Sequence, residues 1–175
     1  MKALLDGLLP RLFPGWIVEQ HFKCIPHQGK SDLDASIPRK LKAWQIPGDR
    51  FVIVRDNDNL NCVDLKARYV ALCQVCGRPE TLIRLVCQEL ESWYLGDLQA
   101  LGEAFANPKL DNIKLRKRIA DPDQWQKPSH ELARIVPGFQ KVGAARAMSQ
   151  TLVETRNCSR SFQVFMQGVR RLAGE

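Results

Sequence analysis

Two pairs of carboxylates carry the strongest chemical signal in the sequence. Asp56 and Asp58 follow the apolar run FVIVR, and Glu89 and Glu91 follow the apolar run LIRLVC. In an extended chain, residues two apart project to the same side, so each pair could share a divalent cation. Carboxylates, water and phosphate oxygens form the usual shell of Mg²⁺ in phosphoryl-transfer sites. The spacing predicts a catalytic Mg²⁺ or Mn²⁺ site with Asp56, Asp58 and Glu89 as ligands and Glu91 as a further ligand or a base.

A simpler explanation of the two aspartates is local structure, because Asp and Asn favour turns and helix caps. The stretch Asp56-Asn57-Asp58-Asn59 is rich in both residue types. A second acidic cluster at a second strand end reduces the weight of this explanation. A calcium loop is excluded, because Leu60 and Asn61 stand where an oxygen donor and a glycine belong.

Two other motifs carry weaker chemistry. Gly29-Lys30-Ser31 resembles the end of a phosphate-binding loop, but Cys24 stands where the first glycine of GxxxxGK[ST] belongs, so it is not a Walker motif. Cys73 and Cys76 form a lone CxxC with no second pair or histidines nearby in sequence, so a zinc site is not expected. A redox protein that uses this pair is the last-ranked alternative.

The elements that must position the carboxylates follow from the apolar pattern. Residues 51–54 form a short continuous apolar run, as in a strand buried on both faces of a parallel sheet, and residues 82–87, apolar except for Arg84, are predicted to form another strand. A helix is predicted between them, from about Val63 to Cys76. The alternation indicates parallel βαβ units, whose ligands bind beyond the carboxyl ends of the strands. Even spacing of apolar residues predicts a third, half-buried strand over residues 16–25.

Helices are predicted for most of the remaining chain. Leucines at helical spacing predict an opening amphipathic helix over residues 2–12, and Asp6 within it argues against a signal peptide. Ser31 or Asp32 is predicted to cap a helix that runs, with a restart or kink at Pro38, to Trp44.

Composition and charge narrow the classes of protein. No apolar run is long enough for a membrane span, and the scattered cysteines suit reduced thiols, so we expect a cytoplasmic protein. Residues 1–108 hold 13 Lys or Arg against 13 Asp or Glu, whereas residues 109–175 hold 13 against 6. This asymmetry predicts an α/β core over residues 1–108 and a basic helical extension of the same domain over residues 109–175, which favours a polyanion as ligand.

Several stretches together resemble a bacterial family catalogued as a domain of unknown function, DUF4276, with a TOPRIM-like fold. They are LLPRLFPG, IPHQGKSDL, PRKLKAW, FVIVRDNDNLNCVDLKAR, QELESWYLGD, PGFQKVGAARAM and SRSFQVFMQGVRRL. The resemblance covers nearly the whole chain, and QELESWYLGD and the KSDL loop are its most specific parts. It implies an α/β fold of the TOPRIM (Rossmann-like) type, with a mostly parallel sheet flanked by helices and a helical C-terminal part.

The resemblance also implies a function. TOPRIM domains hold Mg²⁺ with a glutamate at the end of their first strand and a DxD motif after a later strand, and they act on phosphodiesters. Asp56 and Asp58 match the DxD motif. Members of the family are associated with ATPase partners in phage-defence systems, which implies a nuclease or a nuclease-derived subunit.

One departure from the family pattern is expected to matter. Family members usually begin with a strand that carries an acidic motif, followed by the helix that matches MKALLDGLL, whereas this sequence starts at that helix. We therefore expect the first strand, and one metal ligand with it, to be missing. Either the true start lies upstream of Met1 or the domain is shortened.

Nucleic acid, DNA or RNA, and a partner ATPase are the expected partners, and a homo-oligomer is left open. The alternative to a nuclease is a non-catalytic module, derived from a TOPRIM domain, that binds nucleic acid or the ATPase. Basic residues near the predicted site or in the segment KLDNIKLRKRIA are the candidate contacts to the phosphate backbone. They are Lys30, Lys114, Arg116, Lys117, Arg118 and Lys141.

Overall fold

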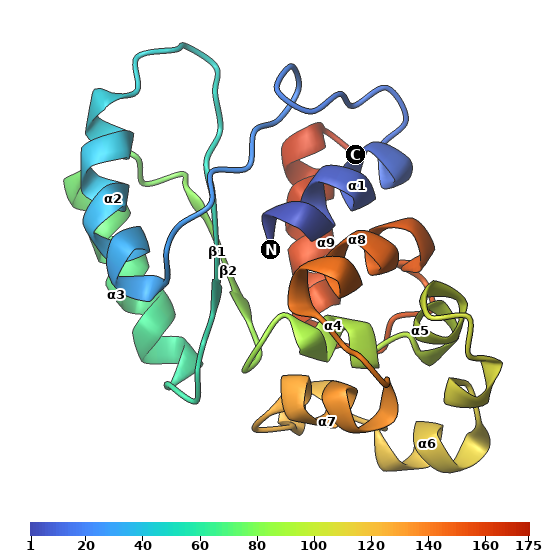
Figure 1. The fold of residues 1–175 in the computed structure, drawn as a ribbon. Coiled ribbons are helices and arrows are strands. Elements are labelled where there is room, and N and C mark those ends of the chain that lie inside the picture. The colour runs from blue at the N-terminus through green and yellow to red at the C-terminus, as the bar shows by residue number, and fades with distance from the viewer.

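The computed structural model describes residues 1–175 as a small parallel sheet covered by helices on both faces (Figure 1). The sheet holds two strands, β1 (Val52–Asp56) and β2 (Leu82–Val86), which pair in parallel with Ile53 opposite Ile83. The helix α3 (Cys62–Val75) connects them, so the predicted βαβ unit is confirmed.

The other elements are mostly short helices. In chain order they are α1 (Lys2–Leu12), α2 (Lys30–Ala43), α4 (Glu91–Leu95), α5 (Leu98–Ala104), η1 (Pro108–Leu110), α6 (Ile113–Arg118), η2 (Pro122–Gln124), α7 (Pro128–Ile135), α8 (Lys141–Thr151) and α9 (Arg160–Ala173). No helix is both long enough and apolar enough to cross a membrane.

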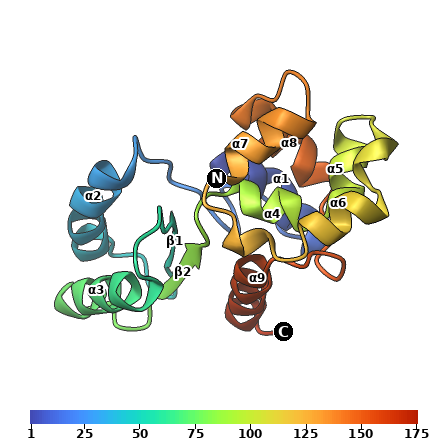
Figure 2. The ribbon, with the colours of Figure 1, turned by 90° about the horizontal axis from the view of Figure 1, so that it is seen from below.

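The two faces of the sheet bury different clusters of side chains. Ile53 and Ile83 point to one face, where they pack with residues of α2 and α3 such as Ile37 and Tyr69. Val86 belongs to the larger cluster on the other face, to which α1 and all the helices from α4 to α9 contribute. Figure 2 shows α2 and α3 together on one side of the strands and the remaining helices on the other. The larger cluster draws on both the first 108 residues and the last 67, so the basic segment packs onto the opening helix.

The predicted strand over residues 16–25 is wrong. The only strand-like pairing in this segment is an isolated β-bridge between Val18 and Phe22. Residues 23–27 belong to no helix or strand. A strand needs a neighbour for its backbone groups, and neither β1 nor β2 bonds to this segment. The three predicted strands are therefore two.

The start of α2 also differs from the prediction. Gly29, with φ of +89°, precedes the first helical residue Lys30, and the Asp32 carboxylate accepts a hydrogen bond from the backbone N–H of Gln28. The predicted caps Ser31 and Asp32 thus lie inside the first turn. Pro38 lies within one continuous helix rather than at a restart.

Close packing of α1 on α8 gives a testable prediction about two glycines. A Cβ on Gly7 would come within 2.8 Å of the Ser149 Cβ, whereas a Cβ on Gly143 would meet nothing closer than 3.8 Å. Gly7→Ala is therefore expected to lower the free energy of unfolding by about 1–3 kcal/mol through overpacking. The matched variant Gly143→Ala is expected to raise it by about 0.5–1 kcal/mol, because alanine favours the helix. Urea unfolding of the two variants measures both changes, and equal effects would contradict the packing argument.

Candidate functional site

The carboxyl ends of β1 and β2 are held together by two interlocked loops. Asn57 donates its backbone N–H to the Val86 carbonyl at 3.0 Å, and its side-chain oxygen accepts the backbone N–H of Gln88. The Gln88 side chain in turn accepts the backbone N–H of Asn59 at 2.9 Å. Asp58, Asn59 and Gln88 all have positive φ, a conformation that Asn and Asp tolerate better than most residues. These loops fix the position of the acidic residues.

Asp56 is a partly buried carboxylate with one fully buried oxygen. It is the last residue of β1, and its Oδ1 atom is buried without a hydrogen-bond partner. Burial, followed by the negative charges of Glu91 and Asp58, raises the pKa of Asp56 to about 7. The positive amino terminus of Met1 acts in the opposite direction. A buried carboxyl group with a free oxygen in a negative field is a place where a cation would be stabilised.

Two further groups lie beside Asp56. Glu91, the first residue of α4, is 4% exposed, and its Oε1 is 3.5 Å from the Nζ of Lys141. Tyr94 is fully buried, and its hydroxyl has no hydrogen-bond partner. Burial and the charges of Glu91 and Asp56 raise the pKa of the Tyr94 hydroxyl well above its ordinary value. The site thus contains the partly buried carboxyl group of Asp56, the buried one of Glu91, an unpartnered hydroxyl and one lysine.

Asp58 is arranged differently from Asp56. The extended conformation ends at Asp56, and the positive φ of Asp58 turns its side chain towards Lys30, whose Nζ lies 3.1 Å from Oδ2. The expectation that the two aspartates project to the same side of one extended segment is therefore wrong. Asp58 still lies near enough to raise the Asp56 pKa, and a shared cation stays a prediction.

Glu89 faces α7 rather than the other carboxylates. Its Oε2 accepts the backbone N–H of Ser129 at 2.8 Å, close to the start of α7. Burial acts to raise the pKa of Glu89, but the hydrogen bonds from Ser129 and the charges of Lys141 and Lys127 outweigh it, so the net pKa is lowered. We infer that Glu89 anchors α7 to the loop after β2.

This anchor predicts a change in stability. Glu89→Ala is expected to lower the free energy of unfolding by about 1–2 kcal/mol at pH 7, because a helix-start N–H loses its acceptor. The lowered pKa means that this contribution is present above pH ~4.5 and is lost as the pH falls through the folded-state pKa, so the difference from the parent shrinks in acid. Urea titrations at pH 7 and pH 3 measure it. The exposed Glu80 gives the control Glu80→Ala, for which a loss as large as that of Glu89→Ala would contradict the assignment.

The predicted basic contacts fall into two groups. Lys30 and Lys141 lie at the carboxylates, as ion-pair partners of Asp58 and Glu91. The other four belong to α6, which lies beyond α4 and α7 as seen from the sheet (Figures 1 and 2). Among these, Arg116 pairs with Asp111 and Arg118 pairs with Glu131, whereas Lys114 and Lys117 are exposed without an ion pair. The structure therefore does not gather all six residues at one place.

A histidine cluster near α2 could be mistaken for a catalytic triad. The Nδ1 atom of His27 lies 3.2 Å from the Ser36 hydroxyl and 3.3 Å from the Asp32 carboxylate. A triad needs the acid and the nucleophile on opposite nitrogens of the ring, whereas here the Ser36 hydroxyl lies closer to Nδ1, the nitrogen that faces Asp32, than to Nε2, from which it is 3.4 Å away. The Ser36 hydroxyl also donates to the Leu33 carbonyl and is almost fully buried. This cluster caps and packs α2.

Sequence reasoning missed two features of the site. Asn57 and Gln88, which lock the loops, were not singled out, and only their position directly after two apolar runs could have pointed to them. Trp93 and Tyr94 are both fully buried in the core, and the unpartnered hydroxyl of Tyr94 could not be foreseen from the sequence. Cys73 and Cys76 are buried free thiols, and burial raises the pKa of Cys73, which does not suit a redox role.

Comparison with known proteins yields a family match. The model of a family described as a domain of unknown function, DUF4276, matches residues 1–170. No curated protein and no solved structure matches the chain.

Proposed function

This chain belongs to the DUF4276 family, and from that premise we propose that it is a Mg²⁺- or Mn²⁺-dependent phosphodiesterase of the TOPRIM type that acts on nucleic acid. Asp56 and Glu91 would hold the metal ion, with Asp58 within reach. The observation that carries the proposal is the buried Asp56 Oδ1 atom, which has no partner at the carboxyl end of a parallel strand. A buried acceptor without a donor is costly, and a bound cation would satisfy it.

The available side chains fit a Mg²⁺ site that is completed by water and substrate better than a metal site whose ligands all come from the protein. No three His, Cys, Asp or Glu side chains are arranged so that they could hold a metal ion by themselves. Mg²⁺ in phosphoryl-transfer sites is often held by one or two protein carboxylates, and water and substrate phosphates supply the remaining ligands. Two carboxyl groups, the partly buried Asp56 and the buried Glu91, meet that requirement. A bound metal ion would stabilise the charge that develops on the phosphate.

The residues around the carboxylates have distinct roles in this proposal. Lys141 and Lys30 would exchange their carboxylate partners for the phosphate groups of the substrate, since both pairs are at least partly exposed. Glu89 keeps α7 in place beside the site. Tyr94, whose buried hydroxyl has no partner, would donate a hydrogen bond to a buried water.

The experiment that tests the proposal is a cleavage assay on labelled single-stranded and duplex DNA and RNA, with Mn²⁺ and with a chelator. Metal-dependent cleavage that is lost on substitution of Asp56 supports it. Absence of cleavage of all four substrates, at any metal concentration that leaves the fold intact, contradicts it.

A non-catalytic binding module is the second candidate, and the ion pairs favour it. Lys30 and Lys141 already neutralise two of the four predicted carboxylates. Such a module would bind nucleic acid, or a partner ATPase, without cleaving either. Salt-dependent binding of nucleic acid without metal-dependent cleavage would select this candidate over the enzyme.

The exposed lysines of α6 give a prediction about nucleic-acid affinity. The double variant Lys114→Gln, Lys117→Gln is expected to weaken duplex binding and to reduce the slope of log affinity against log salt by about 2, because two phosphates would no longer be neutralised. Fluorescence anisotropy over a salt series measures the slope. The exposed lysines of the opposite side give the control Lys42→Gln, Lys66→Gln, which is expected to leave the slope unchanged. An unchanged slope in the first variant would remove α6 from the proposed interface.

A further inference from the structure

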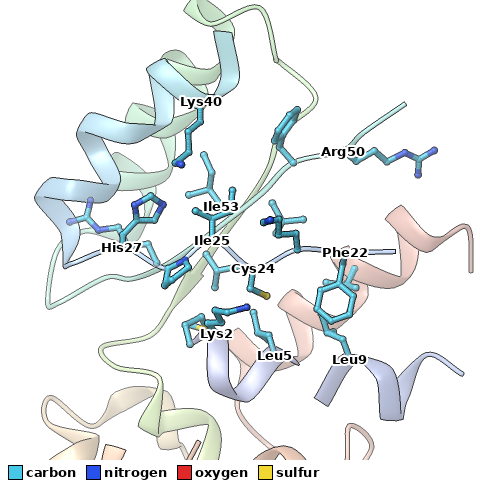
Figure 3. A pocket seen from close by; sticks show the side chains of 18 of the residues that line it. Lys2, Leu5, Leu9, Phe22, Cys24, Ile25, His27, Lys40, Arg50 and Ile53 are labelled. Atoms are coloured by element: carbon cyan, nitrogen blue, oxygen red, sulfur yellow. The ribbon is translucent and has the colours of Figure 1, made fainter. Parts of the chain in front are cut away.

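Two cavities of the molecule differ in character. The larger one, of about 1430 Å³, lies between β1 and residues 22–26, and apolar side chains such as Leu5, Leu9 and Ile53 point into it (Figure 3). The smaller one is an open depression of about 580 Å³, formed by the end of η2, by α7 and by the segment between them. Only one of its seven lining residues, Trp125, is apolar. The depression is therefore a polar surface with a single aromatic side chain.

A buried carboxylate with two guanidinium partners lies in this depression. Glu131 is 5% exposed, and its Oε2 lies 3.1 Å from the Nη2 of Arg134. Its Oε1 accepts a hydrogen bond from Arg118 of α6. Two guanidinium groups on one carboxylate leave one positive charge in excess, and Lys127, which is exposed without an ion pair, adds another. An excess of positive charge in a concave surface attracts anions.

The nearest acidic residues along the chain have partners outside the depression. The Asp123 carboxylate accepts the Ser159 hydroxyl and the backbone N–H of Ser161, both at 2.7 Å. The Asp121 carboxylate accepts the backbone N–H of Asp123 at 3.1 Å. Neither aspartate lines the depression. Glu131 is consequently its only carboxylate, and that group is already paired.

Trp125 supplies an aromatic surface beside these cations. The half-buried indole packs against the larger apolar cluster, and the Arg118 guanidinium lies over its ring, 6.0 Å from the centroid. Arg118 does not line the depression, so another part of the indole faces it. Cations that hold phosphates, combined with an aromatic side chain that contacts a base, are typical of single-stranded nucleic-acid binding. A duplex keeps its bases paired and stacked, which makes them inaccessible to such a side chain.

The depression lies between the carboxylate site and α6. On one side, the backbone N–H of Ser129 in the first turn of α7 binds Glu89 at 2.8 Å, and the charge of Lys127 contributes to the lowered pKa of Glu89. On the other side, Arg118 of α6 binds Glu131. A strand with one phosphate at the carboxylate site would thus continue over the start of α7 into the depression.

We propose that this depression is a subsite for one nucleotide of a single-stranded nucleic acid. The base would contact the indole of Trp125, and Lys127 and Arg134 would bind phosphate groups. Arg134 is available for this contact because Arg118 also neutralises Glu131. The volume lies within the range of about 300–1,000 Å³ that is usual for small-molecule sites. The inference rests on the proposed nucleic-acid ligand, and it specifies a single strand as the form that binds beside the carboxylates.

The experiment measures binding of the full chain to labelled oligo-dT and oligo-U of about twelve nucleotides, and to a duplex of equal length. Fluorescence anisotropy is recorded with a chelator present, so that metal-dependent cleavage does not interfere. Trp125→Leu keeps an apolar side chain against the core and removes the aromatic ring. It is expected to weaken single-strand binding by about five- to a hundredfold and to leave duplex binding nearly unchanged. The matched control is Trp44→Leu, at a half-buried tryptophan that ends α2 on the other side of the strands, and it should bind as the parent does (Figure 2).

A second variant tests the phosphate contacts without altering the core. Lys127→Gln, Arg134→Gln replaces two exposed cations and is expected to reduce the slope of log affinity against log salt by about 1.4 for single strands, since each phosphate contributes about 0.7. The double variant Lys42→Gln, Lys66→Gln is again the control, with an unchanged slope. This measurement decides the question even if Trp125→Leu does not fold.

Three results would overturn the proposal. They are the absence of single-strand binding by the parent, an unchanged single-strand affinity in folded Trp125→Leu, and an unchanged salt slope in Lys127→Gln, Arg134→Gln. The cleavage assay separates this proposal from the enzymatic one. Metal-dependent cleavage together with parent-like binding by the variants would exclude the subsite alone. Weakened single-strand binding by the variants, without any cleavage by the parent, would support the subsite and exclude the enzymatic function alone.

Discussion

At pH 8, the Asp56→Asn variant is expected to be more stable than the parent chain, although the substitution would remove a residue of the proposed site. Burial and the charges of Glu91 and Asp58 raise the pKa of Asp56 from 3.8 to about 7 in the folded state. A shift of this size corresponds to a cost of about 4 kcal/mol for the ionised form. The buried asparagine amide also lacks partners, so we expect a net gain of about 1–3 kcal/mol, or roughly 5 °C in Tm.

The direction of the pH dependence follows from the same shift. Between pH ~4 and ~7 the folded state holds a proton on Asp56 that the unfolded state releases, so the stability of the parent falls as the pH rises through this window. Below pH ~4 both states are protonated, and the difference between parent and variant is expected to disappear. Above pH ~7 the difference reaches its full size.

Mn²⁺ gives this prediction a second readout. A cation bound at Asp56 favours the ionised carboxylate, so Mn²⁺ is expected to raise the Tm of the parent at pH 8 and to leave that of Asp56→Asn unchanged. Thermal unfolding across pH 4–8, with and without Mn²⁺, measures both effects. Glu80→Gln, an exposed carboxylate at the opposite end of β2, is the control and should behave as the parent does. Destabilisation of Asp56→Asn at pH 8 would contradict the assignment of Asp56 as an unsatisfied buried carboxylate.

Loss of cleavage is the second large effect that we expect. Asp56→Asn and Glu91→Gln are each expected to reduce metal-dependent phosphodiester cleavage by about 10²–10³-fold, because charge stabilisation at the phosphate depends on the metal ion that they would hold. The two losses should not add in the double variant, since both substitutions disable one shared site. Initial rates on labelled DNA and RNA with Mn²⁺ measure the change.

The stability measurement makes this loss interpretable. Asp56→Asn is expected to be inactive yet more stable than the parent at pH 8, so its inactivity could not be attributed to unfolding. Glu80→Gln again serves as the control, and it should retain the parent rate. Cleavage by Asp56→Asn at the parent rate would exclude Asp56 from the chemistry and would also point to a contaminating nuclease.

The sequence was sufficient to predict the two strands and the helix between them. Residues 51–54 are apolar at consecutive positions and residues 82–87 are apolar except for Arg84, and both runs form strands of a parallel pair within one or two residues of the predicted bounds. The helix between them was predicted from Val63 to Cys76 and spans Cys62–Val75, because Asn61 caps it and Gly77 follows it. Such elements are determined by local apolar pattern and by their caps, which a sequence displays directly.

The candidate site was predicted only in part. The sequence placed four carboxylates beyond two strand ends, and the structure places the partly buried Asp56 near enough to the buried Glu91 for the charge of Glu91 to raise the Asp56 pKa. Asp58 instead forms an ion pair with Lys30, and Glu89 accepts a hydrogen bond from the backbone N–H of Ser129. Spacing along the chain could not predict which contacts each carboxylate makes. These contacts depend on the left-handed backbone conformation of Asp58 and on the packing of α7, which is distant in sequence, against the loop after β2.

The sequence by itself thus determined the βαβ unit, the helical surroundings and the acidic character of the sheet end, since all three follow from local pattern and composition. Only the tertiary structure decided which carboxylates are buried together, that residues 22–26 have no strand to pair with, and that Lys114 and Lys117 lie away from the carboxylates. Each of these depends on contacts between segments far apart in the chain. The even spacing of Trp16, Val18, Phe22 and Cys24 shows the limit, because a strand also needs a hydrogen-bonding neighbour, and neither β1 nor β2 supplies one to this segment.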